Sequence, residues 1–170
     1  KDKPLAGTMV DRVMESAARN PDGLVGRLSA KLLGGGDAAP VTDVPEAPTR
    51  VYVAPTNYAA QGYEWARALE RADPDVAARN MAVDLPGGYR FPADTIVPIA
   101  AVNGSSAWGH AEWESARQFS HVLVEAERSM FGREFGRDLE AEVAAGTAAG
   151  GSVAFSCHGP DIRGPERPAA

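Results

Sequence analysis

Ser152-Val-Ala-Phe-Ser-Cys-His-Gly-Pro-Asp161 is a short apolar strand pattern that runs directly into a polar turn. An earlier stretch repeats the design, because the apolar run at 50–54 is followed by the polar turn 55–62 and then by a helical pattern. Strands that end in glycine-bearing polar turns before helices are typical of an open α/β sheet, and ligands bind such sheets outside the carboxyl ends of the strands. We therefore expect one rim of the sheet to carry the candidate site, formed by Asn57, Gln61, Gly62, His158, Gly159 and Asp161.

Size and composition indicate a globular domain with an appendage. The chain has 170 residues, of which 44% are hydrophobic and 24% charged, and this is enough to build a core. Its net charge of −6 argues against a nucleic-acid partner, which would need a basic face. No apolar run reaches the roughly 18 residues of a membrane-spanning helix. We expect no signal peptide, and the single cysteine fits a reducing, cytoplasmic location.

Three regions follow one another along the chain. Residues 1–33 are predicted to form a short helical extension, because apolar residues recur there at helical spacing. A basic amphipathic helix can lie on a membrane surface, but we favour packing on its own domain or on a partner. Residues 34–49, rich in glycine and proline and without periodicity, are predicted to be a linker. Residues 50–170 are predicted to form the folded domain.

Strands and helices alternate in the predicted domain. Strands are expected at 51–54, 76–83, 121–124 and 152–156, and Thr95–Val102 is expected to be extended, with Pro98 marking an edge. Helices are expected at 65–72, at 107–119 and on the stripe Phe135, Leu139, Val143. This order predicts an α/β, Rossmann-like and mostly parallel sheet flanked by helices.

Four segments together resemble actinobacterial glycosyltransferase-like proteins. They are Val-Ala-Pro-Thr-Asn-Tyr-Ala-Ala-Gln-Gly-Tyr-Glu-Trp-Ala-Arg-Ala-Leu-Glu at 53–70, His-Val-Leu-Val-Glu-Ala-Glu-Arg at 121–128, Phe-Gly-Arg-Glu-Phe-Gly-Arg-Asp at 131–138 and Phe-Ser-Cys-His-Gly-Pro-Asp-Ile-Arg at 155–163. The resemblance covers roughly residues 50–165 and is to the amino-terminal half of a two-domain GT-B fold. It implies a domain that shapes the acceptor side of a cleft, for transfer from a nucleotide-sugar to a sugar or lipid acceptor. The donor-binding half is not in these 170 residues, so we expect the chain to be incomplete as a catalyst on its own.

A second interpretation is a non-catalytic interaction or assembly module that keeps the Rossmann-like body. Residues 1–49 would then dock on a second domain or a protein partner, folding on contact. A small α/β hydrolase ranks last, because the sequence lacks a G-x-S-x-G elbow.

The turn after the first strand supplies three candidate substrate-binding residues. Asn57 and Gln61 carry amides, and Gly62 would allow a ligand to approach the start of a helix, where backbone N–H groups favour an anion. The turn matches neither G-x-G-x-x-G nor a Walker loop, so we expect no nucleotide cofactor. Asn57 has an alternative role, which is to cap the turn through its side-chain oxygen.

Four residues are candidates for catalysis. His158 titrates near neutral pH and could contact donor or acceptor, with Asp161 orienting its ring and Gly159 lying at the substrate; the alternative is a tight turn fixed against Arg163. Glu125 and Glu127 follow a strand, and we expect at most one of them to face the cleft as a general base. A salt bridge with a nearby arginine is the alternative for both glutamates.

The remaining chemistry-bearing residues are assigned structural roles. Cys157 is expected to be buried as a small hydrophobe. His110 and His121 are expected at the surface and in strand packing. Three scattered histidines without an i,i+4 pair predict no metal site. Among the tryptophans, Trp108 is the one we expect to stack on a sugar or a partner.

Overall fold

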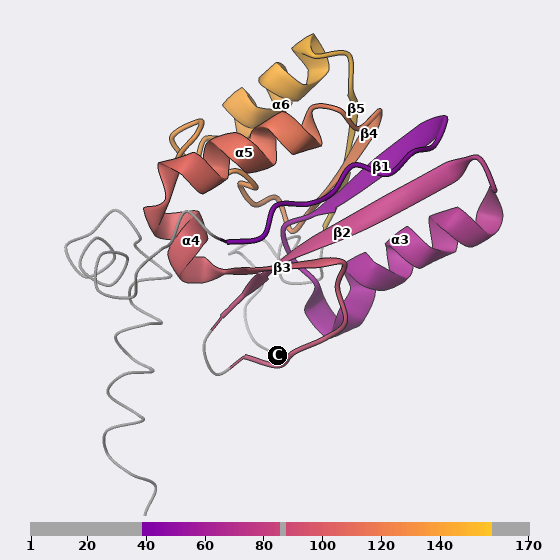
Figure 1. The fold of residues 1–170 in the computed structure, drawn as a ribbon, viewed down its shortest axis with the longest axis horizontal. Coiled ribbons are helices and arrows are strands. Elements are labelled where there is room, and N and C mark those ends of the chain that lie inside the picture. Colours follow the sequence, from indigo (N-terminus) through magenta and orange to yellow (C-terminus); the bar gives the residue numbers. More distant parts are fainter. Residues whose placement is uncertain (1–38, 86–87, 158–170) are drawn as a thin grey trace, which may run out of the picture.

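Strand β1 (Thr49–Ala54) is the centre of a five-stranded sheet in the computed structural model, which describes residues 39–85 and 88–157. The strand order is β3-β2-β1-β4-β5, and all four neighbouring pairs are parallel. The predicted α/β, Rossmann-like class is confirmed (Figure 1). The predicted helical extension lies outside the described residues. After β1 come a 3-10 turn (Tyr58–Ala60), α3 (Gln61–Ala72), β2 (Val76–Asp84), β3 (Thr95–Pro98), α4 (Ile99–Gly104), α5 (Ser106–Ala116), β4 (His121–Glu125), α6 (Leu139–Ala148) and β5 (Ser152–Ser156).

Both faces of β1 are covered along Val51–Ala54, which explains why these four residues are hydrophobic and buried. Successive side chains of a strand point to opposite faces of the sheet. Val51 and Val53 pack with Ala66 of α3, whereas Tyr52 and Ala54 pack on the other face, with residues of α4 and α5. In Figure 1, α3 lies on one side of the sheet and α5 and α6 lie on the other. The buried part of this central parallel strand is accordingly hydrophobic on both faces.

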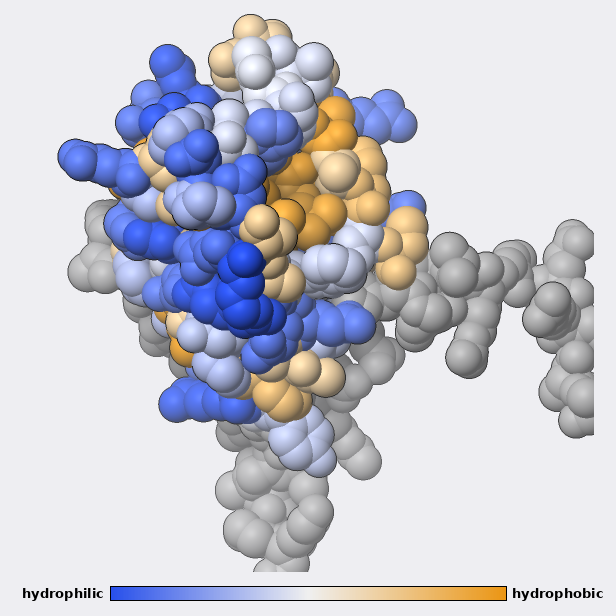
Figure 2. Space-filling view, turned by 90° about the vertical axis from the view of Figure 1, so that its right-hand side faces the viewer, coloured by the Kyte–Doolittle hydropathy of each residue, from blue (hydrophilic) through white to orange (hydrophobic). Residues whose placement is uncertain are grey.

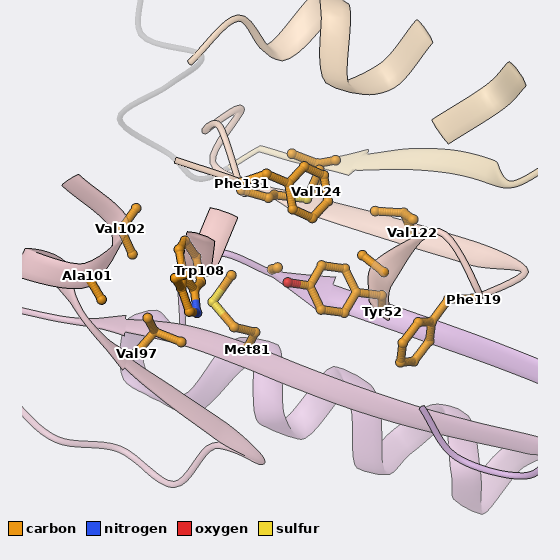
Figure 3. Close-up of a cluster of buried hydrophobic side chains, with 13 residues drawn as sticks. Tyr52, Met81, Val97, Ala101, Val102, Trp108, Phe119, Val122, Val124 and Phe131 are labelled. Carbon is orange, nitrogen blue, oxygen red and sulfur yellow. The ribbon is translucent and has the colours of Figure 1, made fainter. Parts of the chain in front are cut away.

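The larger core cluster centres on aromatic rings between the sheet and α5 (Figure 3). Tyr52 lies 5.4 Å from Phe119 and 6.3 Å from Phe131, measured between ring centroids. Trp108 is only 1% exposed, and its Nε1 donates to the carbonyl oxygen of Pro40 at 3.0 Å. The expectation that Trp108 stacks on a sugar or partner is therefore wrong, because its ring is enclosed by the core.

The described end of the predicted linker packs on the domain through a buried carboxylate. Glu112 of α5 accepts hydrogen bonds from the backbone N (2.9 Å) and Oγ1 (2.6 Å) of Thr42 and from the hydroxyl of Tyr52 (2.7 Å). Ser115 Oγ donates to the carbonyl oxygen of Thr42. We call Thr42, Tyr52, Glu112 and Ser115 the Glu112 cluster. Burial, and then the Glu112 carboxylate, raise the pKa of Tyr52, so its hydroxyl remains a donor.

Two element boundaries differ from the sequence-based expectation. Thr95–Val102 is not extended throughout, because the chain turns into α4 directly after Pro98. The helix predicted on Phe135 begins later, at Leu139, because the carboxylate of Asp138 caps it by accepting from the backbone N of Glu140 (2.9 Å) and Ala141 (3.2 Å). Phe135 instead packs edge-on against Trp113, with ring centroids 5.1 Å apart.

The order in which the chain adds strands to the sheet reverses between β1 and β4. From β1 the chain builds outward through β2 to β3, then returns to place β4 and β5 on the other side. In parallel sheets the carboxyl ends at such a switch point leave a crevice for ligands. Figure 2 shows a different face, on the side where α3 ends and β2 begins, which is mostly hydrophilic with one hydrophobic area. The candidate site is therefore sought at the carboxyl edge.

Candidate functional site

A pocket of about 710 Å³ opens at the carboxyl edge of the sheet. Segments that follow β1, β2 and β4, together with residues of α4, form its walls. Its size lies in the range that holds a small organic ligand. The predicted location at the ends of the strands thus coincides with a ligand-sized cavity.

Asn57 ties two walls of this pocket together. Its Oδ1 accepts from the backbone N of Tyr63 at 3.1 Å, and its Nδ2 donates to the carbonyl oxygen of Pro92 at 2.7 Å. The first contact satisfies a free N–H group in the first turn of α3, and the second fixes the segment after β2. Asn57 lines the pocket, as expected for a site residue, but both ends of its amide are engaged in holding the loops.

Gln61 and Gly62 begin α3 and do not line the pocket. Gln61 is exposed, whereas Gly62 is buried. A Cβ at Gly62 would lie 2.5 Å from Oε2 of Glu125 and 2.6 Å from Nδ2 of Asn80. The absence of a side chain at Gly62 therefore makes room for the polar side chains of Glu125 and Asn80.

Glu125 ends β4 at the switch point and is fully buried. Its Oε2 accepts a long hydrogen bond, 3.5 Å, from Oγ1 of Thr56, a residue that lines the pocket. Within the described part of the chain its Oε1 has no hydrogen-bond partner, and neither has Oδ1 of the buried Asn80. Burial raises the pKa of Glu125 to about 7, while the Thr56 hydroxyl acts in the opposite direction. A carboxyl group with that pKa exchanges its proton near neutral pH.

Glu127 points away from this buried position. The backbone takes left-handed φ angles at Ala126 (55°) and Glu127 (49°), which turns the chain sharply after β4. Glu127 is exposed, and its Oε1 accepts from Sγ of Cys157 at 3.2 Å. Of the two glutamates, Glu125 is the one beside the pocket. The expectation that Cys157 is buried is wrong, because the residue follows the edge strand β5 and is exposed.

Three predicted site residues, His158, Gly159 and Asp161, lie outside the described part of the chain, which ends at Cys157. Their placement relative to the pocket stays a prediction. His110 and His121 are both exposed. In the described ranges no group of three or more His, Cys, Asp or Glu side chains could hold a metal ion, and no helix there is long and apolar enough to cross a bilayer.

A buried carboxylate of α6 shapes the pocket wall that follows β4. Glu142 accepts from Oγ of Ser129 (2.6 Å) and from the backbone N of Met130 (2.8 Å) and Phe131 (3.3 Å). Burial raises the pKa of Glu142, and these three donors act in the opposite direction. Ser129 and the preceding Arg128 line the pocket, so Glu142 holds the segment that carries them.

Sequence reasoning missed several residues of the pocket. Arg128 and Arg137 lie in the segments 121–128 and 131–138 but are not among the predicted site residues. The aromatic residues Tyr58, Tyr89 and Phe91 also line the cavity. Asn80 lies within the predicted strand 76–83 without an assigned role, and it is a buried polar residue of β2. The signal available for it was a polar residue between Ala78 and Ala82, which share its face of the strand.

Replacing Glu125 with Gln should change how stability depends on pH. The pKa is about 7 in the folded protein and near 4.5 in the unfolded chain, so between these values only the folded state keeps the proton. The free energy of unfolding of the native protein therefore falls as pH rises through this range. Urea denaturation should show Glu125→Gln gaining about 2 kcal/mol relative to the native protein between pH 5 and pH 8. Glu127→Gln is the control, and equal pH profiles for native protein and Glu125→Gln would contradict the assignment.

Comparisons with protein-family models, with curated proteins and with solved structures give no match to this chain.

Proposed function

We propose that the protein is the acceptor-side domain of a glycosyltransferase-type enzyme and that Glu125 is its general base. The observation that carries this proposal is the buried carboxyl group of Glu125, which lies behind Thr56 at the edge of a ligand-sized pocket. A general base works best when its pKa is close to the working pH, and burial raises the pKa of Glu125 to about 7.

The Thr56 hydroxyl connects the pocket with the carboxylate. It lines the cavity and donates to Oε2 of Glu125. In the proposed step the acceptor hydroxyl donates its proton to Thr56 Oγ1 while Thr56 passes its own proton to Glu125. The acceptor oxygen bonds to the anomeric carbon of the donor sugar, and the nucleoside diphosphate leaves with the electrons of the broken bond.

Turnover of nucleotide-sugars by the full-length gene product tests the proposal. UDP-glucose, UDP-N-acetylglucosamine and GDP-mannose are the donors, and release of nucleoside diphosphate is measured with water and with simple sugars as acceptors. We expect a rate that rises with pH through about 7 and falls at least 100-fold in Glu125→Gln, the size of a typical general-base contribution.

Glu127→Gln is the matched control, because Glu127 is an exposed carboxylate two residues away; its rate should stay within about twofold of the native rate. No release from any donor by the native protein would overturn the proposal, and so would an undiminished rate in Glu125→Gln. Docking of a second domain or protein on residues 1–49 and a cytoplasmic location stay predictions from the sequence.

A further inference from the structure

Two fully buried polar side chains, Asn80 and Glu125, lie on the same face of the sheet. Val53 of β1 pairs with Asn80 of β2 on one side and with Leu123 of β4 on the other. Leu123 and Ala78 both pack with Val53 on the face that α3 covers. Alternate residues of a strand share a face, so Asn80, two positions after Ala78, and Glu125, two positions after Leu123, point to this side as well. The two strands thus bring both polar groups under α3.

Each of these side chains has one oxygen atom without a hydrogen-bond partner in the described residues. These atoms are Oε1 of Glu125 and Oδ1 of Asn80. The orientation of the Asn80 amide is fixed, because its Nδ2 donates to the carbonyl oxygens of Val53 (3.1 Å) and Met81 (3.4 Å). Its Oδ1 can therefore act only as an acceptor, and a buried acceptor without a donor is destabilising.

The backbone at Gly62 allows the two groups to approach each other. Oε2 of Glu125 and Nδ2 of Asn80 lie 2.5 Å and 2.6 Å from the point where a Cβ of Gly62 would stand. Oε2 already accepts from the Thr56 hydroxyl at 3.5 Å, so Oε1 is the position left for a proton on the carboxyl group. A proton on Oε1 would turn one unpaired acceptor into a donor for the other.

Resting on the proposed function, we infer that Asn80 is the positioning residue of the general base, and that Oδ1 of Asn80 accepts a hydrogen bond from Oε1 of protonated Glu125. One hydrogen then satisfies both unpaired oxygens. In the ionised state the same two oxygens are both acceptors, and neither is satisfied by the other. The contact therefore favours uptake of a proton by Glu125 and makes its carboxylate a stronger base.

The charged groups near this pair are engaged elsewhere. Asp94 accepts from the backbone N of Asn80 at 2.8 Å, and it pairs with Arg67 of α3 at 2.9 Å. Glu127, on the turn after β4, is exposed. Burial and one neighbouring hydroxyl shift the pKa of Glu125, and no charged side chain in the ranges 39–85 and 88–157 is among the causes. The amide of Asn80 is thus free to control the proton affinity of Glu125 without a competing ion pair.

An NMR pH titration of the full-length gene product tests the inference. Glutamate is labelled with ¹³C at the side-chain carboxyl group, and Glu125→Gln identifies the signal, which we expect to titrate near pH 7 in the native protein. Asn80→Ala removes the acceptor and lets water reach the carboxyl group. Both effects should lower the pKa of Glu125, by about one pH unit in total. The pH profile of turnover should move in the same direction.

Asn80→Asp should have the opposite effect. It places a second carboxyl group beside Glu125, and two such groups share one proton, so the higher pKa of the pair should rise by about one pH unit or more. Val53→Ala is the matched control for loosened packing, because it removes buried side-chain volume on the same face but no hydrogen-bonding group. It should lower stability and leave the pKa of Glu125 unchanged.

The outcomes separate this inference from the proposed function. A pKa of Glu125 that stays the same or rises in Asn80→Ala overturns the inference, and so does an Asn80→Asp protein whose carboxyl pair shows no raised pKa. If Asn80→Ala does not fold, Asn80→Asp decides alone. If both variants shift the pKa as expected while Glu125→Gln keeps its full turnover, the hydrogen bond between Asn80 and Glu125 stands and the role of Glu125 as general base fails.

Discussion

Gly132→Ala should destabilise the protein by about 3 kcal/mol, more than most surface substitutions do. Gly132 has φ of 57°, and a Cβ there would overlap the carbonyl oxygen of Val102 and lie 3.5 Å from Trp108. The first neighbour is backbone, which can yield only if α4 moves. Because Val102 also lines the pocket, we expect ligand binding to weaken together with stability. Urea denaturation measures the loss of stability, and the turnover assay described above measures the effect on the pocket.

Gly136→Ala is the control for this substitution. Gly136 has a similar φ of 63°, but a Cβ there would meet nothing within 4 Å. It should therefore show only the conformational cost of the left-handed region, about 1 kcal/mol. Equal losses at the two glycines would mean that contact with Val102 costs nothing and would contradict the packing described for this loop.

Glu112→Ala should cost about 4 kcal/mol, because it removes the acceptor of the Glu112 cluster. The backbone N and hydroxyl of Thr42 and the hydroxyl of Tyr52 would be left as buried donors without an acceptor. The side chain also leaves a cavity beside the core. Thermal and urea denaturation should show the loss, and limited proteolysis should cut near Thr42, since the segment loses its main attachment to α5.

Glu114→Ala is the matched control on the same helix. Glu114 is half-exposed and pairs with Arg117 at 3.2 Å on the surface, a contact worth at most about 0.5 kcal/mol. A small effect of Glu112→Ala, similar to that of Glu114→Ala, would show that Thr42 is held by packing alone.

The alternation of strands and helices could be predicted from the sequence because it depends on local signals. The apolar runs at β1 and β4 and the helical stripe of α3 are short-range patterns, and the structure confirms them. The α4 segment was missed because Ile99-Ala-Ala-Val is apolar without a period, and only the helical turn after Pro98 distinguishes it from a strand. The start of α6 was misjudged because Phe135 has helical spacing, whereas the Asp138 cap decides where the helix begins.

The pocket opens at the edge of the sheet that the sequence indicates, and Asn57 is the predicted site residue that lines it. Glu125 could be proposed because it follows a strand directly. Its burial depends on Gly62 and Asn80, which lie 63 and 45 positions earlier in the chain. The arginines could not be assigned in the same way, because Arg128 and Arg137 line the same cavity as the aromatic residues after β2 only once the chain is folded. Local pattern identifies the edge, and the long-range contacts decide which side chains share the cavity.

The side-chain amide of Asn57 has a mechanical consequence. Because its oxygen accepts from the first turn of α3 and its nitrogen donates to Pro92, Asn57 links the loop after β1 to the segment after β2. Neither can swing outward without breaking a bond that crosses 35 positions of sequence. A change that widens the pocket for a bulky molecule must therefore move both of these segments together. Otherwise it must move the segment after β4, which carries Arg128.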